Sequence, residues 1–192
     1  MNYIGLLILF ACNAAHAAGA RIGLEYEHEK DNKSGIRNHA LTVKPGWEFS
    51  KDSVINLIEL SIERNRDADA DSSGIRAKET KLFLRLRHNR SINDSFAYYI
   101  RGGVGRSIND QRNFNYGYIE PGLKYKFSEV WEWTVAIREI DSIDGTRGQH
   151  VRKYITGPSF SVDKNNEIEL RYVKGHGDKD VNSWSLGYTH KF

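Results

Sequence analysis

The last ten residues of the chain, Ser183-Trp184-Ser185-Leu186-Gly187-Tyr188-Thr189-His190-Lys191-Phe192, alternate in character without a break. Every second side chain, beginning with Trp184, is aromatic, aliphatic or imidazole, and the side chains between them are small or polar. Because successive side chains of a strand point to opposite faces, this stretch predicts a strand with one apolar and one polar face. Such a strand suits a soluble β-sandwich as well as the wall of a membrane barrel, so the remaining sequence has to distinguish the two.

The composition fits one folded domain and excludes several functions. A chain of 192 residues with a net charge of +3 has too small a basic excess to indicate nucleic-acid binding. The mean hydropathy is −0.61, and no run of 18 apolar residues follows residue 17, which excludes a helical membrane span. A membrane β-barrel stays compatible with these values because only alternate side chains of its strands face lipid.

The first 17 residues differ from all that follow. An apolar run from Tyr3 to Ala11 precedes Ala15 and Ala17, the small-x-small pattern that signal peptidase requires. We therefore expect residues 1–17 to be a signal peptide and residues 18–192 to be the mature domain. A loose lipoprotein motif around Cys12 is the alternative. Cleavage after Ala17 would remove the only cysteine and the only methionine, so no disulfide would stabilise the exported chain.

From residue 20 onward the chain divides into alternating segments separated by polar or turn-forming residues. The predicted strands span about 21–29, 39–49, 54–64, 81–87, 96–107, 116–127, 131–138, 151–162, 167–174 and 183–192. In the third segment we place Ile58, Leu60 and Ile62 outside, because that register turns Glu59 and Glu63 away from lipid. A proline in the middle of a strand disfavours a regular ladder, so we expect a bulge at Pro121.

The separators between these segments alternate between short and long. An even number of strands, short periplasmic turns, long external loops and two periplasmic termini characterise outer-membrane barrels. The sequence thus predicts an all-β, transmembrane, antiparallel up-and-down barrel of ten strands, with twelve or eight as alternatives, in the outer membrane of a Gram-negative bacterium. Aromatic residues beside the short turns predict a periplasmic girdle, and Tyr26, Tyr116, Tyr154, Tyr172 and Trp184 are candidates for the outer one.

The predicted inward faces are rich in charge. Glu25, Glu27, Glu48, Glu59, Glu63, Glu120, Glu132 and Glu169 are their predicted carboxylates. The basic residues selected as pore-lining are Lys81, Arg85, Arg87, Arg101, Lys124, Arg138, Lys153 and Arg171. Arginine forks match carboxylates bidentately, so one interpretation is a narrow channel for small acidic solutes. The other is a barrel closed by its own ion pairs, with a structural or adhesive role, since so many charges cannot be buried dry and unpaired.

Three stretches carry a resemblance to a known family. Leu24-Glu25-Tyr26-Glu27-His28-Glu29, Glu120-Pro121-Gly122-Leu123-Lys124-Tyr125 and the closing strand from Asn182 resemble small monomeric outer-membrane porins specific for oligogalacturonate and their sialic-acid-related relatives. The resemblance implies a monomeric, passive channel for acidic oligosaccharides or small anions, lined by basic residues, in a barrel of twelve strands. The aromatic end at Phe192 resembles the strand by which the barrel-assembly machinery recognises such proteins. Outer-membrane lipid and lipopolysaccharide are the other expected partners.

Catalysis and metal chemistry are not expected. An omptin-like hydrolase is the competing class, with Asp141, Asp144 and His150, or His176, Asp178 and Asp180, in its external loops. In hydrophilic loops such residues are more often solvated than catalytic. We therefore expect that the protein is not an enzyme and uses no cofactor. Asp67, Asp69 and Asp71 alternate like the start of a calcium loop, but Ser72 and Lys78 replace the required glycine and glutamate.

Overall fold

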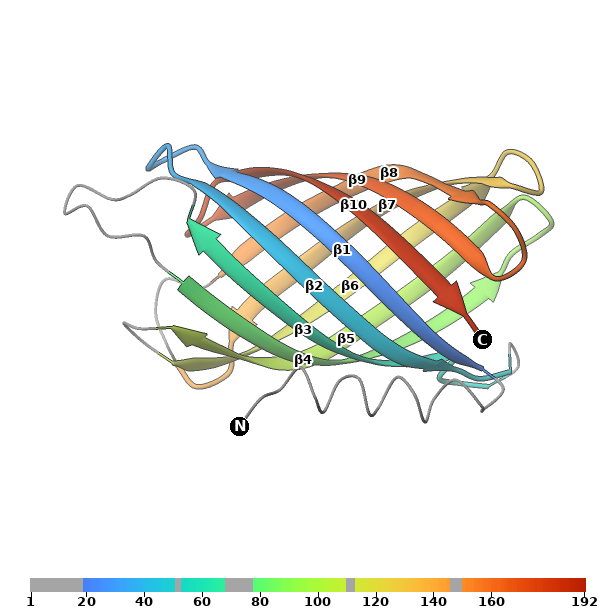
Figure 1. Ribbon diagram of the computed structural model, residues 1–192, viewed down its shortest axis with the longest axis horizontal. Coiled ribbons are helices and arrows are strands. Elements are labelled where there is room, and N and C mark those ends of the chain that lie inside the picture. Colours follow the sequence, from blue (N-terminus) through green and yellow to red (C-terminus); the bar gives the residue numbers. More distant parts are fainter. Residues whose placement is uncertain (1–18, 51–52, 68–77, 110–112, 146–149) are drawn as a thin grey trace.

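The computed structural model describes residues 19–50, 53–67, 78–109, 113–145 and 150–192, and these residues form strands joined by turns and loops (Figure 1). The strands are β1 (Ala20–Asp31), β2 (Arg37–Glu48), β3 (Leu57–Asp67), β4 (Lys78–Ser91), β5 (Phe96–Asn109), β6 (Phe114–Lys126), β7 (Trp131–Ser142), β8 (Val151–Ser161), β9 (Asn166–Gly177) and β10 (Val181–Lys191). No helix within the described ranges is long and apolar enough to cross a membrane. The predicted signal peptide and Cys12 lie outside the described residues.

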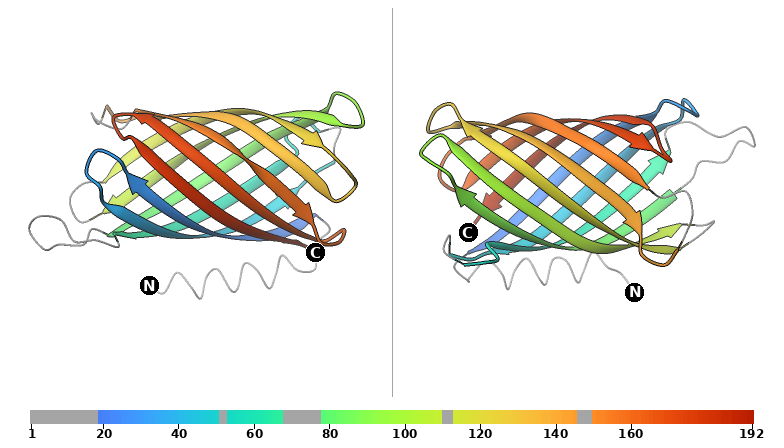
Figure 2. Two further views of the ribbon diagram at one scale, coloured as in Figure 1. Left: turned by 90° about the horizontal axis from the view of Figure 1, so that it is seen from above. Right: turned by 180° about the vertical axis from the view of Figure 1, so that it is seen from behind.

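The ten strands close into one antiparallel barrel in which each strand pairs with its neighbours in sequence (Figure 2). The seam joins β1 to β10, with Leu24 opposite Tyr188 and Asp31 opposite Val181. Beyond the end of β10, the Phe192 backbone N–H donates to the Ala20 carbonyl oxygen at 3.0 Å. Closure leaves no free sheet edge, which confirms the predicted ten-strand barrel and excludes the alternatives of twelve and eight.

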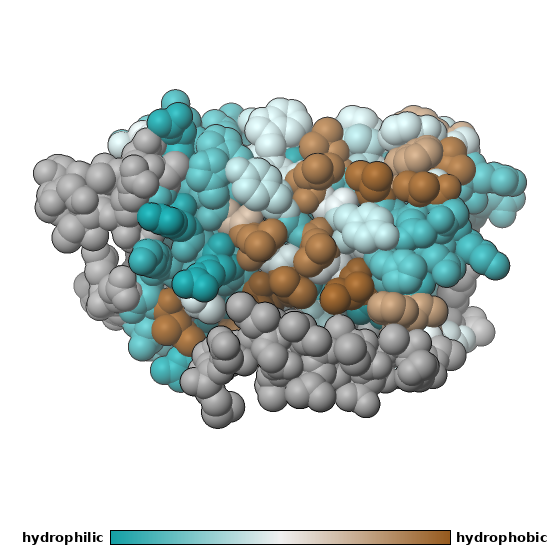
Figure 3. All heavy atoms as spheres, viewed as in Figure 1, coloured by the Kyte–Doolittle hydropathy of each residue, from teal (hydrophilic) through white to brown (hydrophobic). Residues whose placement is uncertain are grey.

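Side chains sort to the two faces of the wall as the alternation predicted. In β4, Leu84 and Leu86 are exposed on the outside whereas Phe83 and Arg85 are buried on the inside. The third predicted strand has the register chosen for it, since Leu60 is exposed and Glu59 is buried. In Figure 3 hydrophobic side chains gather over the middle of the outer wall and hydrophilic ones toward its two ends. The outside therefore has the apolar band and polar margins of a wall built for a bilayer.

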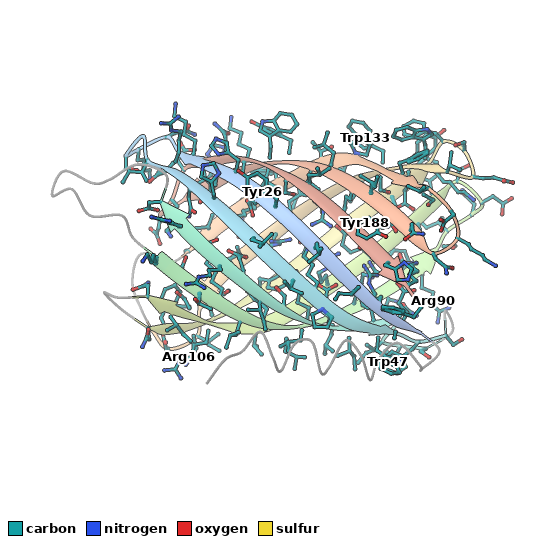
Figure 4. All side chains as sticks on the ribbon, viewed as in Figure 1. Tyr26, Trp47, Arg90, Arg106, Trp133 and Tyr188 are labelled. Atoms are coloured by element: carbon teal, nitrogen blue, oxygen red, sulfur yellow. The ribbon has the colours of Figure 1, made fainter. Side chains whose placement is uncertain are left out.

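The two ends of the barrel differ. We call the end where β1 connects to β2, β3 to β4, β5 to β6, β7 to β8 and β9 to β10 the loop end. The other, where β1 begins and β10 finishes, is the turn end. Exposed aromatic side chains surround the turn end, and Figure 4 shows Trp47 and Trp133 toward this side and Arg106 near the loop end. The aromatic girdle beside the short turns is thus present.

Some details predicted from the sequence are wrong. Loop lengths do not alternate strictly, because the turn-end connection between β2 and β3 spans residues 49–56, while the loop-end connection between β9 and β10 spans only 178–180. Strands β5 and β9 extend into stretches predicted as loops, because the ladder continues wherever a neighbouring strand is in register. Tyr116 is not part of an outer girdle, since only 4% of it is exposed on the inward face.

The bulge predicted at Pro121 is also absent. Pro121 pairs with Ile100 of β5, and the β6–β7 register is the same at Ile119 opposite Glu139 as at Gly122 opposite Ala136. Proline lacks the N–H for a ladder hydrogen bond, and its outward position leaves the ring in the apolar belt. The pairing of β6 with β7 is interrupted at Glu120 and Pro121 and resumes in the same register.

One glycine permits a close approach of two strands. A Cβ on Gly157 of β8 would overlap the Leu170 carbonyl oxygen of β9 and lie 2.9 Å from the Arg171 Cα. We expect Gly157→Ala to lower the free energy of unfolding by about 1–3 kcal/mol, because the β8 and β9 backbones would have to move apart. Gly187→Ala is the matched control, since its Cβ would lie 3.8 Å from the nearest atoms and should change stability by less than about 0.5 kcal/mol. Urea unfolding of both variants in lipid vesicles measures the difference, and equal losses would contradict the prediction.

Candidate functional site

All eight basic residues selected from the sequence project from the inward face of the wall, and each has an acidic neighbour. The ion pairs are Lys81 with Glu63 and Glu79, Arg85 with Glu59, Arg87 with Glu48, Arg101 and Arg138 with Glu120, Lys124 with Glu132, Lys153 with Glu29, and Arg171 with Glu25 and Glu169. The alternation of each strand determines this inward placement. Whether these residues line a path for solute stays a prediction.

Glu120 of β6 is the centre of the most buried cluster. Only 1% of its surface is exposed. The Arg138 Nε donates to its Oε2 at 2.5 Å, the Tyr99 hydroxyl donates to its Oε1 at 2.9 Å, and the Arg101 Nη1 lies 3.3 Å from the same Oε1. Two guanidinium groups and one phenol thus hold a single carboxylate. Removing that carboxylate would leave two cations without their partner.

A second cluster joins β1 and β2 to β9 across the inner face of β10. Glu25 pairs with Lys44 and lies 3.4 Å from the Arg171 Nη1, and Arg171 also pairs with Glu169. On β3 and β4, the Arg85 Nη1 lies 3.3 Å from the Glu59 Oε1. Except for Arg171 with Glu169, these contacts link different strands, and together they form a lattice of paired charges near mid-height.

Two cavities lie on either side of this lattice. The loop-end cavity has a volume of about 120 Å³, and the turn-end cavity about 830 Å³. Their linings share no residue. Along β6, β7 and β8 the inward side chains between them are Glu120, Ala136 and Ile155, each buried, and Ala136 and Ile155 pack with Tyr99 and Val173. Within the described residues the lumen is therefore closed at mid-height.

Both cavities have a small excess of basic side chains. Lys81, Arg85, Arg138, Lys153 and Lys179 line the loop-end cavity together with Glu27, Glu29, Glu63 and Glu79. The turn-end cavity has an excess of basic side chains. These are Arg21, Lys44, Arg87, Arg90, Arg101, Lys124, Lys126, Arg171 and Lys191, facing Glu48, Glu59, Asp94, Glu129, Glu132, Glu167 and Glu169. Both cavities can thus attract an anion, and the turn-end cavity is the one with room for a larger solute.

Sequence reasoning missed some inward groups. Glu29 and Glu79 both face the lumen. Glu29 is the last residue of the predicted strand 21–29 and continues its inward alternation, and Glu79 lies one alternation step before the predicted strand 81–87. Phe83 and Tyr118 lie against guanidinium groups, with the Arg85 Cζ 4.9 Å from the Phe83 ring and the Arg138 Cζ 5.2 Å from the Tyr118 ring. No sequence pattern predicts these contacts between guanidinium groups and rings, because they depend on the stagger between strands.

The histidines and aspartates considered for catalysis lie at the loop end, outside the lumen. The His150 Nδ1 lies 3.7 Å from the Asp141 Oδ2, and its backbone N–H donates to Asp178 at 2.8 Å. His176 Nδ1 lies 3.6 Å from the Asp180 Oδ1. No group of three or more metal-ligating side chains that could hold an ion occurs among the described residues, and Asp69 and Asp71 fall outside them. Both histidines are about half exposed, in surroundings that solvate them.

Comparison with known proteins identifies a fold and no family. No protein-family model matches the chain, and curated protein sequences contain no match to it. An outer-membrane channel from Pseudomonas putida F1 is similar in structure, with a TM-score of 0.58, 8% identity, and coverage of 92% of this chain and 96% of that one. The β domain of the Bordetella autotransporter Brka has a TM-score of 0.56 and 8% identity, covering 91% and 99%. The NanC porin has a TM-score of 0.51 and 9% identity, covering 88% and 100%.

These similar structures perform different tasks on one architecture. The resemblance to small porins noted from the sequence is confirmed at the level of the barrel, since the NanC porin is among them, but an autotransporter domain is as similar. At such low identities the likeness concerns fold alone. The chain thus has the channel-like fold of small outer-membrane β-barrels.

Proposed function

We propose that the protein is a narrow channel for small acidic solutes in the outer membrane of a Gram-negative bacterium, with the turn end and both termini in the periplasm. The turn-end cavity of about 830 Å³ carries the proposal, because its basic side chains converge on the arginine lattice at mid-height. Arginine forks bind carboxylates in a fixed geometry, so a solute carboxylate can replace a glutamate on Arg101 or Arg171.

The closed lattice sets the size of the solute. Passage requires ion pairs such as Arg85 with Glu59 to separate, so single small anions are favoured over extended acidic oligosaccharides. A chain of sugars would need the Glu120 and Glu25 clusters to open together. Oligosaccharide transport is therefore the more demanding form of the proposal, and blockage of current by acidic oligosaccharides would support it.

We expect neutralisation of the basic wall to reduce anion preference. In planar bilayers the triple variant Arg85→Gln, Arg87→Gln, Arg101→Gln should shift the anion-to-cation permeability ratio toward or below unity, because the carboxylates stay and the cations are lost. The control is Lys30→Gln with Lys174→Gln, which removes exposed cations from the outer wall. A triple variant with unchanged selectivity would exclude these arginines from the ion path.

A second function is favoured by one specific observation. Every selected cation is paired and the two cavities share no lining residue, as in a barrel closed by its own salt bridges. Such a protein would serve a structural or adhesive role. The same bilayer recordings separate the two, since a folded, inserted protein that carries no current supports the closed barrel.

We also propose that the protein is not an enzyme. His150 and His176 at the loop end are exposed, and His150 lies near Glu139 and Asp141 while His176 lies near Asp180. Incubation of the folded protein with peptide and phospholipid substrates should release no product, and cleavage that is lost in His150→Ala would overturn this.

A further inference from the structure

Four cations project outward from three adjacent strands near the loop end. They are Arg64 and Arg66 of β3, Lys78 of β4 and Arg106 of β5, and all four are exposed. Outward placement follows from the alternation, because Arg64 lies two residues after the outward Ile62 on β3, and Arg106 lies opposite the outward Leu82. Figure 4 shows Arg106 on the outer wall toward this end. We call these four residues the β3–β5 basic patch.

The register gathers the patch around Thr80. Arg64 lies directly opposite Thr80, Arg66 lies directly opposite Lys78, and Arg106 lies opposite Leu82, two residues further along β4. Neighbouring strands are about 4.8 Å apart and same-face residues of one strand about 6.6 Å apart. Arg66 and Arg106, the outermost pair, are then about 16 Å apart at the backbone, so the patch suits a ligand with more than one negative group, and the Thr80 hydroxyl adds a donor at its centre.

No side chain of the patch makes an ion pair with any other part of the chain that the structure describes. Arg152, at the same end of the barrel on β8, pairs with the partly exposed Glu139 of β7 instead. Like charges directly across a strand pair repel, as Arg66 and Lys78 must. An anion held between them removes this repulsion, so the arrangement is complementary to a negatively charged ligand.

The surface below the patch decides which anion fits. Ile62, Leu82, Leu84 and Val104 continue the same strands toward the middle of the barrel, and Leu84 and Val104 are about half exposed. A ligand that places phosphate on the patch would lay an attached hydrocarbon chain on these residues. At the turn end, outward positions of β7 and β8 carry Trp131, Trp133 and Phe160, and on β4 Arg90 is at an outward position. The two leaflets therefore meet different chemistry.

We propose that the β3–β5 basic patch binds the phosphate groups of a phosphorylated glycolipid in the outer leaflet, of the lipid A type. Arg64 and Arg106 hold phosphate oxygens as forks, Lys78 and Arg66 neutralise a second charge, and the acyl chains pack on Leu82, Leu84 and Val104. The proposal uses the orientation proposed above, with the loop end outside, but it does not depend on conduction through the lumen.

The test measures lipid affinity in vitro. The folded protein in phosphatidylcholine nanodiscs is titrated with bisphosphorylated lipid A, and bound lipid is counted by native mass spectrometry. We expect Arg64→Gln with Arg106→Gln to weaken binding by about tenfold, since each cation near a lipid phosphate contributes a several-fold factor. Lys30→Gln with Lys174→Gln removes the same charge from β1 and β9 and should leave affinity within about twofold. If the first pair fails to fold, Arg66→Gln with Lys78→Gln tests the same patch.

Three results would overturn the proposal. Equal weakening in the patch variant and in the control would show attraction by net charge alone. Undiminished binding of lipid A stripped of its phosphates would show that the acyl chains suffice. Displacement of the lipid by millimolar inorganic phosphate would identify a site for the free anion. None of these results bears on channel activity, and a barrel that carries no current can still bind the lipid.

Discussion

Glu120→Ala should lower the free energy of unfolding by about 3–5 kcal/mol, the largest effect expected of any single substitution in the lumen. The reason is geometric, because Arg101 and Arg138 both depend on this carboxylate and their side chains are only 13% and 19% exposed. The buried Tyr99 hydroxyl would also lose its acceptor. Urea unfolding in lipid vesicles, followed by tryptophan fluorescence, measures the loss.

Glu132→Ala is the matched control for Glu120→Ala. Its side chain also pairs with one inward cation, Lys124, but lies at the turn-end cavity with 30% of the side chain exposed. Water can solvate Lys124 once the carboxylate is gone, so the expected loss is about 0–1 kcal/mol. If both variants lose equally little, the middle of the barrel is hydrated and the lattice is not what closes it.

Leu84→Arg should destabilise the barrel by about 2–4 kcal/mol in a bilayer, as expected for arginine near the hydrocarbon midplane. Leu84 lies on the outer wall between Leu60 of β3 and Val104 of β5, all three exposed and apolar. A guanidinium there would have no partner on the wall and would have to draw water or headgroups inward. Reversible unfolding from vesicles gives the free energy.

Asn115→Arg shows whether depth in the bilayer is the cause. Asn115 is exposed on the outward face at the loop end of β6, opposite Arg106. Arginine at a membrane margin costs about 0–1 kcal/mol. Equal losses for Leu84→Arg and Asn115→Arg would mean that the middle of the wall does not face hydrocarbon.

The barrel could be predicted from the sequence because the alternation of outward and inward side chains is a property of each strand by itself. A strand needs only alternate residues to choose a face, so the sorting of Leu84 from Arg85 and of Leu60 from Glu59 could be predicted without any tertiary contact. The same rule predicted that all eight basic residues point inward. Its failures came where a neighbouring strand, and not the segment itself, decides, as in the extended end of β5 and the even ladder past Pro121.

The contacts inside the lumen could not be predicted in this way. Arg171 meets Glu25 across 146 positions of sequence, and Lys153 meets Glu29 across 124. Such pairs are set by strand tilt and by the stagger accumulated around the whole ring, which no single segment encodes. Closure of the lumen at Glu120, Ala136 and Ile155 follows from these pairs and from side-chain volume. The sequence could thus predict a charged interior but could not decide between an open and a closed one.

The seam between β1 and β10 bears on how the chain reaches this state. These two strands are the most distant in sequence of all the pairs that touch, so the loop-closure entropy of their contact is lost before most of its hydrogen bonds form. Long-range pairing of this kind slows folding. Until the first and last strands meet, the growing sheet has two unpaired edges that can recruit other chains. The arrival of the carboxyl-terminal segment is therefore the step that ends the exposure of the nascent protein to aggregation.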